Sequence, residues 1–341
     1  MSFNIKIQPS GHEFRAAPDE SILEAALAHG LLLPYSCRNG ACGACKGKVV
    51  TGEVDYGEHQ DTTLTGAEKT AGMALFCCAR PLSDMVIESH EVTRAQEIPV
   101  KMLPCRVEKM QKVADDVMVL SLKLPANERL QFLAGQYIDI LQKDDKPRSF
   151  SLANAPHDDA FLELHVRNIA GGTFTEHVFN RMKERDILRI KGPLGTFFLR
   201  EDSAKPVIFV ASGTGFAPVK AIIEHALKIG FKPGMHFYWG VRKVSDLYML
   251  DKIGEWEAAG IKFTPVVSDE TWDGRTGFVH EAVLQDYSDL SGYAVYACGA
   301  PVVVEAAHRD FTVQRGLPQD AFFSDAFTFA PKSPTPPAGN T

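Results

Sequence analysis

The chain has no apolar run approaching the ~18 residues that a membrane-spanning helix needs. Its most apolar stretch, residues 293–304, is interrupted by Gly299 and Pro301. The first residues lack the basic start and apolar segment of a signal peptide. These absences predict a cytoplasmic protein that has no membrane partner.

A block of Lys and Arg is missing as well, and the net charge is −7 at pH 7. A dedicated nucleic-acid-binding protein would need such a block. Hydrophobic residues make up 45% and charged residues 23% of the chain, which is typical of folded proteins and excludes disordered, collagen-like and coiled-coil chains. At roughly 150 residues per domain, 341 residues predict two or three domains.

Cysteine is scarce, and the seven thiols are an odd number that cannot all pair into disulfides. Five of the seven fall between residues 37 and 78. A disulfide framework would be spread more evenly, so the clustering indicates metal binding in a reducing compartment.

The sequence pattern changes three times along the chain. Residues 1–92 hold the clustered cysteines and a helix that begins at a capping box, Ser21 with Glu24, and ends at Gly30. The chain then shows alternating strands, typical of an antiparallel barrel, and later apolar strands that alternate with helices, typical of a doubly wound parallel sheet. We predict a linker at 93–103, a β-barrel domain at 104–203, an α/β domain at 204–330 and a disordered tail at 331–341.

The cysteine loop has C-x4-C-x2-C spacing, formed by Cys37, Cys42 and Cys45, and further thiols follow after 31 residues. This is the plant-type 2Fe-2S pattern. The intervening residues are glycines and alanines, which leave room for backbone N–H groups to approach the cluster sulfurs. A zinc knuckle is the alternative, but such sites usually have two close pairs of ligands, and here only Cys42 and Cys45 are so spaced.

The fourth thiolate is Cys77 or Cys78, because adjacent residues satisfy the spacing equally well. Cys105 has no partner in sequence and is expected to be a small buried side chain.

Two segments of the barrel region could bind a flavin nucleotide. In Arg148-Ser149-Phe150-Ser151, an Arg can pair with a pyrophosphate, an aromatic ring can stack on a flavin and a hydroxyl can bond a flavin nitrogen. Downstream, His165-Val166-Arg167 precedes Gly171-Gly172-Thr173-Phe174-Thr175, a glycine-rich turn that enters a predicted helix and could present N–H groups to phosphate. The alternative for the second segment is a plain hairpin.

Two turns of the α/β region could bind a nicotinamide nucleotide. Gly213-Thr214-Gly215 lies between a predicted strand and helix, where a pyrophosphate can rest on the helix N-terminus. Cys298-Gly299 follows another predicted strand, at the carboxyl edge where open sheets bind ligands. The alternative for Cys298 is a buried cysteine at a strand end.

Taken in order, these motifs resemble the ferredoxin–NADP reductase superfamily with a plant-type ferredoxin domain fused at the N-terminus. The family's R-x-[YF]-S motif matches Arg148, Phe150 and Ser151, and its phosphate turn matches residues 171–175. Its G-T-G-x-A-P turn matches Gly213 to Pro218, and its C-G-x-P motif matches residues 298–301. The last cluster cysteine of related reductases lies in an L-x-C segment, which here favours Cys77.

The resemblance implies a β-grasp ferredoxin domain, a flavin barrel and a nicotinamide domain, with FAD, NADH and a 2Fe-2S cluster as cofactors. The enzyme would be an NADH-dependent iron–sulfur flavoprotein reductase. It would take a hydride from NADH onto the flavin and deliver single electrons through the cluster. Ser151 and Cys298 are the predicted catalytic residues, and Phe327 is predicted to cover the flavin, unless Phe322, Phe323 and Phe327 only pack a final edge strand.

The resemblance also implies an electron-accepting partner protein, CDP-4-keto-6-deoxyglucose dehydrase or an oxygenase component, and a monomeric reductase. NADP-using relatives present Ser-Arg to the 2′-phosphate, where this chain has Ser268-Asp269, so we predict a preference for NADH. Two other functions stay open: a redox sensor without turnover, and a flavin reductase or diaphorase without a partner protein.

Overall fold

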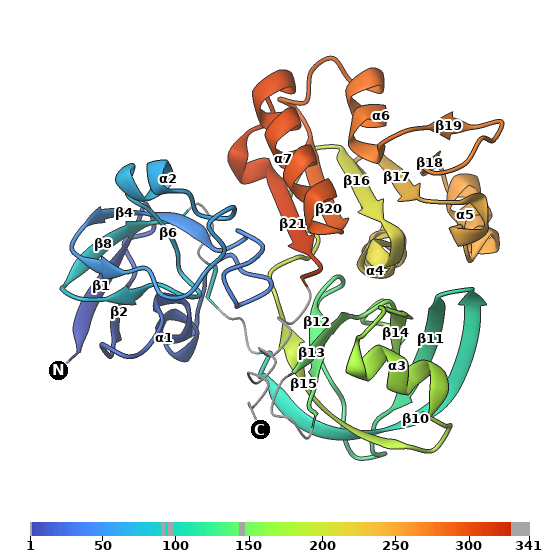
Figure 1. Cartoon of the computed structure of the whole chain (residues 1–341), viewed down its shortest axis with the longest axis horizontal. Coiled ribbons are helices and arrows are strands. Elements are labelled where there is room, and N and C mark those ends of the chain that lie inside the picture. The colour runs from blue at the N-terminus through green and yellow to red at the C-terminus, as the bar shows by residue number, and fades with distance from the viewer. Residues whose placement is uncertain (1, 90–92, 95–97, 143–146, 329–341) are drawn as a thin grey trace, which may run out of the picture.

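The computed structural model describes residues 2–89, 93–94, 98–142 and 147–328, which form three domains (Figure 1). We name them the N-terminal domain (2–89), the barrel domain (101–203) and the C-terminal domain (204–328). The predicted disordered tail, 331–341, lies outside the described residues. No helix of the described part of the chain could cross a membrane.

The N-terminal domain is a five-stranded mixed sheet, in the order β2-β1-β8-β4-β6, packed against one longer helix. The predicted helix is confirmed as α1, where the Ser21 hydroxyl accepts a hydrogen bond from the Glu24 N–H at 3.2 Å. Apolar residues on one side of α1, including Ile22, pack on the sheet beside Ile5 and Ile7. The elements are β1 Phe3–Gln8, β2 Glu13–Ala16, α1 Ile22–Ala28, β3 Leu31–Leu32, β4 Lys46–Thr51, β5 Val54–Asp55, α2 Gly66–Thr70, β6 Met73–Leu75, β7 Arg80–Pro81 and β8 Met85–Glu88.

The predicted linker, residues 93–103, contains regular structure at both ends. Strand β9, Thr93–Arg94, pairs with β3, and β10 begins at Lys101 because its first residues pair with β15. Loss of side-chain periodicity predicts a linker, but backbone pairing does not require an alternating pattern.

The barrel domain is a six-stranded antiparallel sheet in the order β13-β12-β15-β10-β11-β14. A bridge between Leu152 and Leu164 joins the two outer strands, so the sheet closes as the predicted barrel. Its interior is filled by apolar side chains such as Val107, Leu120 and Ile138. The elements are β10 Lys101–Ala114, β11 Val117–Lys123, β12 Tyr137–Ile140, β13 Arg148–Ser151, β14 Leu162–Arg167, α3 Thr173–Asn180 and β15 Ile187–Leu194.

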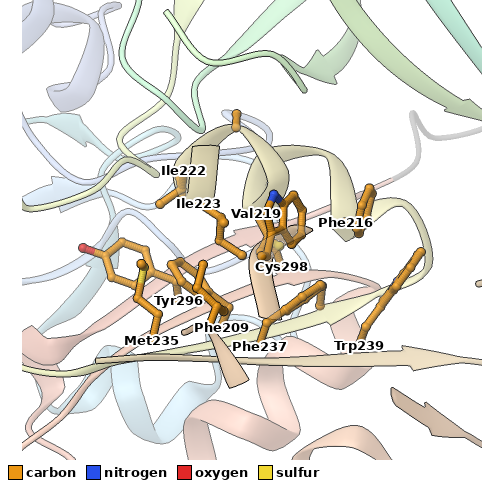
Figure 2. Close-up of a cluster of buried hydrophobic side chains, with 14 of the residues drawn as sticks. Phe209, Phe216, Val219, Ile222, Ile223, Met235, Phe237, Trp239, Tyr296 and Cys298 are labelled. Carbon is orange, nitrogen blue, oxygen red and sulfur yellow. The ribbon is translucent and has the colours of Figure 1, made fainter. Parts of the chain in front are cut away.

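The C-terminal domain is a six-stranded, wholly parallel sheet in the order β19-β18-β17-β16-β20-β21, which confirms the predicted doubly wound fold. Side chains of α4 and α5 pack on one face, around Phe216 and Trp256, and those of α6 and α7 pack on the other. Figure 2 shows Phe216 of α4 in this core together with Phe237 and Trp239 of β17. The elements are β16 Val207–Ser212, η1 Gly213–Gly215, α4 Phe216–Ile229, β17 Met235–Val241, η2 Val244–Asp246, α5 Leu250–Ala258, β18 Lys262–Val267, β19 Arg275–Thr276, α6 Val279–Asp286, β20 Ala294–Gly299, α7 Pro301–Arg315, η3 Gln319–Ala321 and β21 Phe322–Ala326.

Strand β21 forms an edge of the parallel sheet beside β20. The Phe323 ring stacks on Tyr296 with 4.7 Å between ring centroids, and Phe322 packs with the core on the α6 and α7 side. For these two phenylalanines, the structure has the edge-strand packing that the sequence left as an alternative. The β21 end of the sheet points toward the N-terminal and barrel domains, so all three domains meet there (Figure 1).

Candidate functional site

The thiols of the four predicted metal ligands interact in two pairs, although no group of three or more His, Cys, Asp or Glu side chains among the described residues has the arrangement of a metal site. The Cys42 thiol donates to the Cys37 sulfur and lowers the pKa of Cys37 to about 7. In the second pair, the Cys45 thiol donates to Cys77 and, with Cys78, lowers the pKa of Cys77 to about 3. Two pairs of sulfurs are the arrangement that two irons need, with two thiolates on each iron.

Backbone N–H groups of the cysteine loop point at these sulfurs. The amides of Asn39 and Ala41 favour the thiolate of Cys37, and the Gly40 amide favours that of Cys77. The Cys37 amide lies 3.4 Å from the Cys42 sulfur. Because such donors stabilise negative charge on sulfur, the loop fits a cluster held by thiolates.

Cys78 lies beside the second pair and contacts its Cys77 member. Its sulfur is 3.5 Å from the Cys77 sulfur, and its pKa is raised by the hydrogen bond to Cys77 and by burial. Gly40, at φ 73°, approaches it so closely that an added Cβ would lie 2.9 Å from the Cys78 sulfur. A larger residue could not replace this glycine without moving the loop. Cys105 is buried in the barrel core, as expected.

The predicted flavin strand, β13, presents its side chains in different directions. Ser149 donates to Asp139 at 2.6 Å, while the Arg148 guanidinium reaches the Thr173 hydroxyl at 3.3 Å. The partly exposed Phe150 ring lies 5.3 Å from the buried Phe174 ring. Arg148 and Thr173 are therefore brought together from the two predicted flavin segments.

The glycine-rich turn leads into α3, as predicted. Gly172 is the N-terminal cap of this helix, and no side chain of the described residues caps it. The Thr175 hydroxyl bonds the backbone of Ile169 and Gly172, which shapes the turn. Gly171 is exposed at its tip. The first-turn N–H groups and the Arg148 guanidinium thus form a cradle that suits a phosphate group.

His165 and Val166 do not face this cradle. The His165 ring is fully buried, and its two nitrogens are bonded to Tyr248, at 3.1 Å, and Glu163, at 2.9 Å. Its ring also lies against Phe216 of α4. Val166 belongs to the barrel core. His165 therefore helps to hold the barrel against the C-terminal domain, which spacing alone does not reveal.

Arg167 reaches the predicted nicotinamide turn. Its side chain bonds Asp116 at 2.9 Å and lies over Gly213, whose φ of 53° is left-handed. Arg242, which follows β17, bonds the same Asp116 oxygen at 2.9 Å. The guanidinium groups of Arg167 and Arg242 therefore both lie where the barrel domain contacts the C-terminal domain.

The G-T-G-x-A-P segment forms the turn η1 and the first turn of α4. Trp239 donates from its indole to the Gly213 carbonyl at 2.9 Å, and Thr214, Gly215 and Pro218 are buried. A Cβ on Gly215 would lie 2.5 Å from the Cys298 carbonyl oxygen, so only glycine allows η1 to pack on β20.

Cys298 lies in the hydrophobic core beneath this turn (Figure 2). Its thiol donates to the Gly215 carbonyl at 3.0 Å, and burial raises its pKa well above the usual range. The neighbouring backbone is also tied: the Gly299 carbonyl accepts from the Phe327 N–H at 2.7 Å, and Ala300 donates to Ser212 at 2.8 Å. The predicted residues Gly215, Cys298, Gly299 and Phe327 are thus brought together.

Ser268 and Asp269 lie at the carboxyl end of β18, next to the end of β17. The Ser268 hydroxyl donates to Asp269 at 2.5 Å, and the Asp269 N–H donates to the Arg242 carbonyl at 2.9 Å. Asp269 is exposed at this edge of the sheet.

Sequence reasoning missed Asp325, which lies where the three domains meet. Its buried carboxylate accepts hydrogen bonds from Ser36 of the N-terminal domain and from Ser151 of β13, the latter at 3.2 Å. The signal for it was a lone acid within the apolar run Phe322 to Phe327.

Comparison with known protein families confirms the three predicted modules in their predicted order. The family model for a 2Fe-2S iron-sulfur cluster binding domain matches residues 5–82. The models for an oxidoreductase FAD-binding domain and an oxidoreductase NAD-binding domain match residues 104–199 and 209–309.

Two curated relatives match nearly the whole chain. A CDP-6-deoxy-L-threo-D-glycero-4-hexulose-3-dehydrase reductase from Yersinia pseudotuberculosis serotype I (strain IP32953) is 43% identical over 331 residues, 96% of this chain and 99% of the relative. The reductase component DmpP of phenol 2-monooxygenase from Pseudomonas sp. (strain CF600) is 33% identical over 340 residues, 97% of this chain and 96% of the relative.

The solved structures give the same picture. The crystal structure of Amycolatopsis cytochrome P450 reductase GcoB is similar with a TM-score of 0.76 at 34% identity, over 95% of this chain and 98% of that one. A ferredoxin reductase in carbazole 1,9a-dioxygenase has a TM-score of 0.69 at 26% identity, over 96% and 99% of the two chains.

Proposed function

Because the chain belongs to the family of iron–sulfur flavoprotein reductases that join 2Fe-2S, FAD-binding and NAD-binding domains, we propose that its electron acceptor is a dehydrase. The substrate of that dehydrase is a CDP-linked 6-deoxy-4-hexulose. The observation that carries this proposal is the 43% identity to the Yersinia dehydrase reductase, against 33% to the phenol monooxygenase reductase component.

The chain is an electron-transfer reductase whose cofactors are FAD, a 2Fe-2S cluster and NADH. When bound, NADH supplies a hydride, the flavin accepts two electrons and releases them singly, and the cluster carries one electron at a time.

The residues of the cysteine loop hold the cluster. We assign Cys37 and Cys42 to one iron and Cys45 and Cys77 to the other, in agreement with the two thiol pairs. The loop amides stabilise the negative charge of the thiolates. We leave Cys78 outside the ligand set because Cys77 is the thiol that pairs with Cys45.

The barrel domain binds the FAD. Arg148 and the N-terminus of α3 would hold the pyrophosphate, and Phe150 would offer a ring for stacking. Ser151 donates its hydroxyl hydrogen to Asp325 at 3.2 Å, so its oxygen would be left to accept a hydrogen bond from the flavin ring. This assignment is supported by the bond between Arg148 and Thr173, which joins the two segments into one cradle. Arg167 extends the positive charge toward the nicotinamide turn.

The C-terminal domain binds the nicotinamide nucleotide at the η1 turn. Cys298 keeps that turn in place through its bond to the Gly215 carbonyl. The exposed Asp269 repels a 2′-phosphate and can accept from a ribose hydroxyl, so NADH is preferred over NADPH. We propose that Phe327, whose N–H donates to the Gly299 carbonyl, covers the flavin.

The test is reconstitution with purified acceptors. The holoenzyme and NADH are combined anaerobically with a CDP-6-deoxy-4-hexulose 3-dehydrase and its substrate, and separately with a phenol monooxygenase component. We expect turnover with the dehydrase and at most slow turnover with the monooxygenase. Faster turnover with the monooxygenase would assign the reductase to an oxygenase system instead.

A further inference from the structure

The segment just before the first cluster cysteine is bound by both other domains. The Tyr35 N–H donates to the Thr196 hydroxyl at 3.0 Å, and the Tyr35 hydroxyl accepts from the Gly195 N–H at 2.9 Å. The Ser36 carbonyl accepts from the Tyr137 hydroxyl at 2.8 Å. These barrel-domain contacts are buried, so water does not compete for them.

The third partner of this segment is Asp325, on the last strand of the C-terminal domain. One of its oxygens accepts from the Ser36 hydroxyl and the other from the Ser151 hydroxyl. The side chain lies opposite Cys298 in the pairing of β20 with β21. One carboxylate thus joins the cysteine loop, the flavin strand and the sheet that carries the nicotinamide turn.

A carboxylate in such a position is costly to bury, and apolar packing would stabilise the junction more simply. Burial raises the pKa of Asp325 above its ordinary value, which shows this cost. The hydrogen bonds from the Ser36 and Ser151 hydroxyls offset only part of the rise. The geometry gives a reason for an acid here: each oxygen satisfies a hydroxyl from a different domain. A side chain with a single acceptor could not do this.

We propose that Asp325 is a positioning residue that holds the cysteine loop against the flavin strand through Ser36, so that the cluster domain stays docked during turnover. Ser36 directly precedes the ligand Cys37, so a shift of this serine moves the cluster relative to the barrel. This proposal rests on the assigned cluster and flavin sites, but it does not depend on which acceptor is used.

The experiment compares Ser36→Ala holoenzyme with a Ser10→Ala control. Ser10 is an exposed residue of the same domain, in the turn between β1 and β2. In anaerobic stopped-flow with NADH and no partner protein, Ser36→Ala should keep the rate of flavin reduction but slow cluster reduction about tenfold, because small displacements of reacting groups cost large factors in rate. Hydrogen–deuterium exchange should rise in peptides covering 31–38 and 193–199 and stay unchanged in the control.

Cluster reduction and exchange within twofold of wild type in Ser36→Ala would overturn the proposal. If that variant does not fold, Asp325→Asn serves in its place, because it changes the carboxylate that accepts from Ser36 and Ser151. Asp325→Asn should raise exchange in both peptide groups and in β13, since it disturbs both serines. A failure of the dehydrase assignment would leave all these measurements unaffected.

Discussion

The cysteine loop and the domain junction are both parts of one electron-transfer site, but the chain builds them differently. All loop ligands except Cys77 come from nine consecutive residues, 37–45, and the loop's own amides surround their sulfurs. The junction joins residues as far apart as Ser36 and Asp325, 289 positions apart in the chain. A local site carries its own geometry, whereas an assembled site depends on the packing of whole domains.

This difference predicts how the two parts respond to change. A substitution in the loop should remove the cluster and leave the other two domains working. A substitution between domains should weaken several functions together or shift stability. The following predictions test that separation, beginning with the largest effect.

Replacing Cys42 with Ala should abolish electron delivery to any acceptor protein, by about 100-fold or more, because one iron loses a thiolate. Flavin reduction by NADH should stay within twofold, since the barrel and C-terminal domains keep their contacts. Visible absorption of the purified variant and stopped-flow reduction with NADH measure the two effects.

The matched control is Cys105→Ala, which removes a buried thiol of the barrel core without touching the loop. It should keep the cluster absorption and electron delivery. If Cys42→Ala still delivered electrons to an acceptor protein, Cys78 would be able to complete the ligand set. The cluster site would then not depend on the loop of residues 37–45 alone.

Lys220 tests the other side of the comparison, the contact between the barrel and C-terminal domains. Its ammonium group is almost fully buried and lies 3.3 Å from Glu163 and 3.0 Å from Glu224. Lys220→Met removes both ion pairs and leaves Glu163 with its bond to His165, so it should lower the free energy of unfolding by about 3 kcal/mol. Urea unfolding followed by tryptophan fluorescence measures this change in the free energy of unfolding, because all three tryptophans lie in the C-terminal domain.

Lys252→Met is the control, since it removes a similar but exposed pair with Glu255. Its effect should be below about 0.5 kcal/mol. Equal effects of the two substitutions would contradict the importance of the buried network around His165.

The same contrast explains what could be predicted from the sequence. The spacing of Cys37, Cys42 and Cys45 identified the cluster loop, and Gly213 and Gly215 identified the nicotinamide turn, because short turns need particular residues at fixed positions. The strand and helix patterns predicted the barrel and the doubly wound sheet, and the family resemblance implied the β-grasp domain. These signals are all local in the chain.

What the sequence did not reveal depends on contacts between domains. His165 lies within a flavin motif, yet its ring holds Tyr248 and Glu163 at the boundary with α4. Cys298 lies near the end of a strand, at the edge of the sheet where ligands bind, yet its thiol donates a hydrogen bond to the Gly215 carbonyl. Neither partner choice could be inferred from spacing, because each is set by how separate elements pack.

His236 provides a pH test confined to the C-terminal domain. Burial, together with the charge of Lys262, lowers the pKa of His236 to about 4, so the folded domain keeps it neutral while the unfolded chain, with a pKa of about 6.5, takes up a proton. The stability is therefore present above about pH 6.5 and is lost as the pH falls toward 4, with a slope of at most about 1.4 kcal/mol per pH unit.

Tryptophan fluorescence in urea, repeated between pH 4 and 7, should follow this slope, and His236→Asn should flatten it. The charges of Asp286 and Arg275 also act on the pKa of His236. The ion pair between these two residues must therefore stay intact in the comparison. An unchanged slope in the variant would assign the pH dependence to other groups.

The smallest expected effect concerns the coenzyme. Asp269→Asn removes one exposed negative charge at the edge that faces the nucleotide, and an exposed charge pair is worth about 1 kcal/mol in water. The ratio of kcat/KM for NADPH to that for NADH should therefore rise about fivefold, and more at low salt than at high salt, because mobile ions screen exposed charges.

Glu270→Gln is the matched control, since this neighbouring carboxylate accepts from the Val244 N–H and should leave the ratio unchanged. The guanidinium of Arg242 lies 2.9 Å from Asp116 and 3.4 Å from Asp246. If the NADPH to NADH ratio rises only when Asp116→Asn is combined with Asp269→Asn, then a barrel-domain acid, and not Asp269 alone, sets the coenzyme preference. Coenzyme choice would then belong with the assembled part of the site, although its best-known signal lies in two consecutive residues of the sequence.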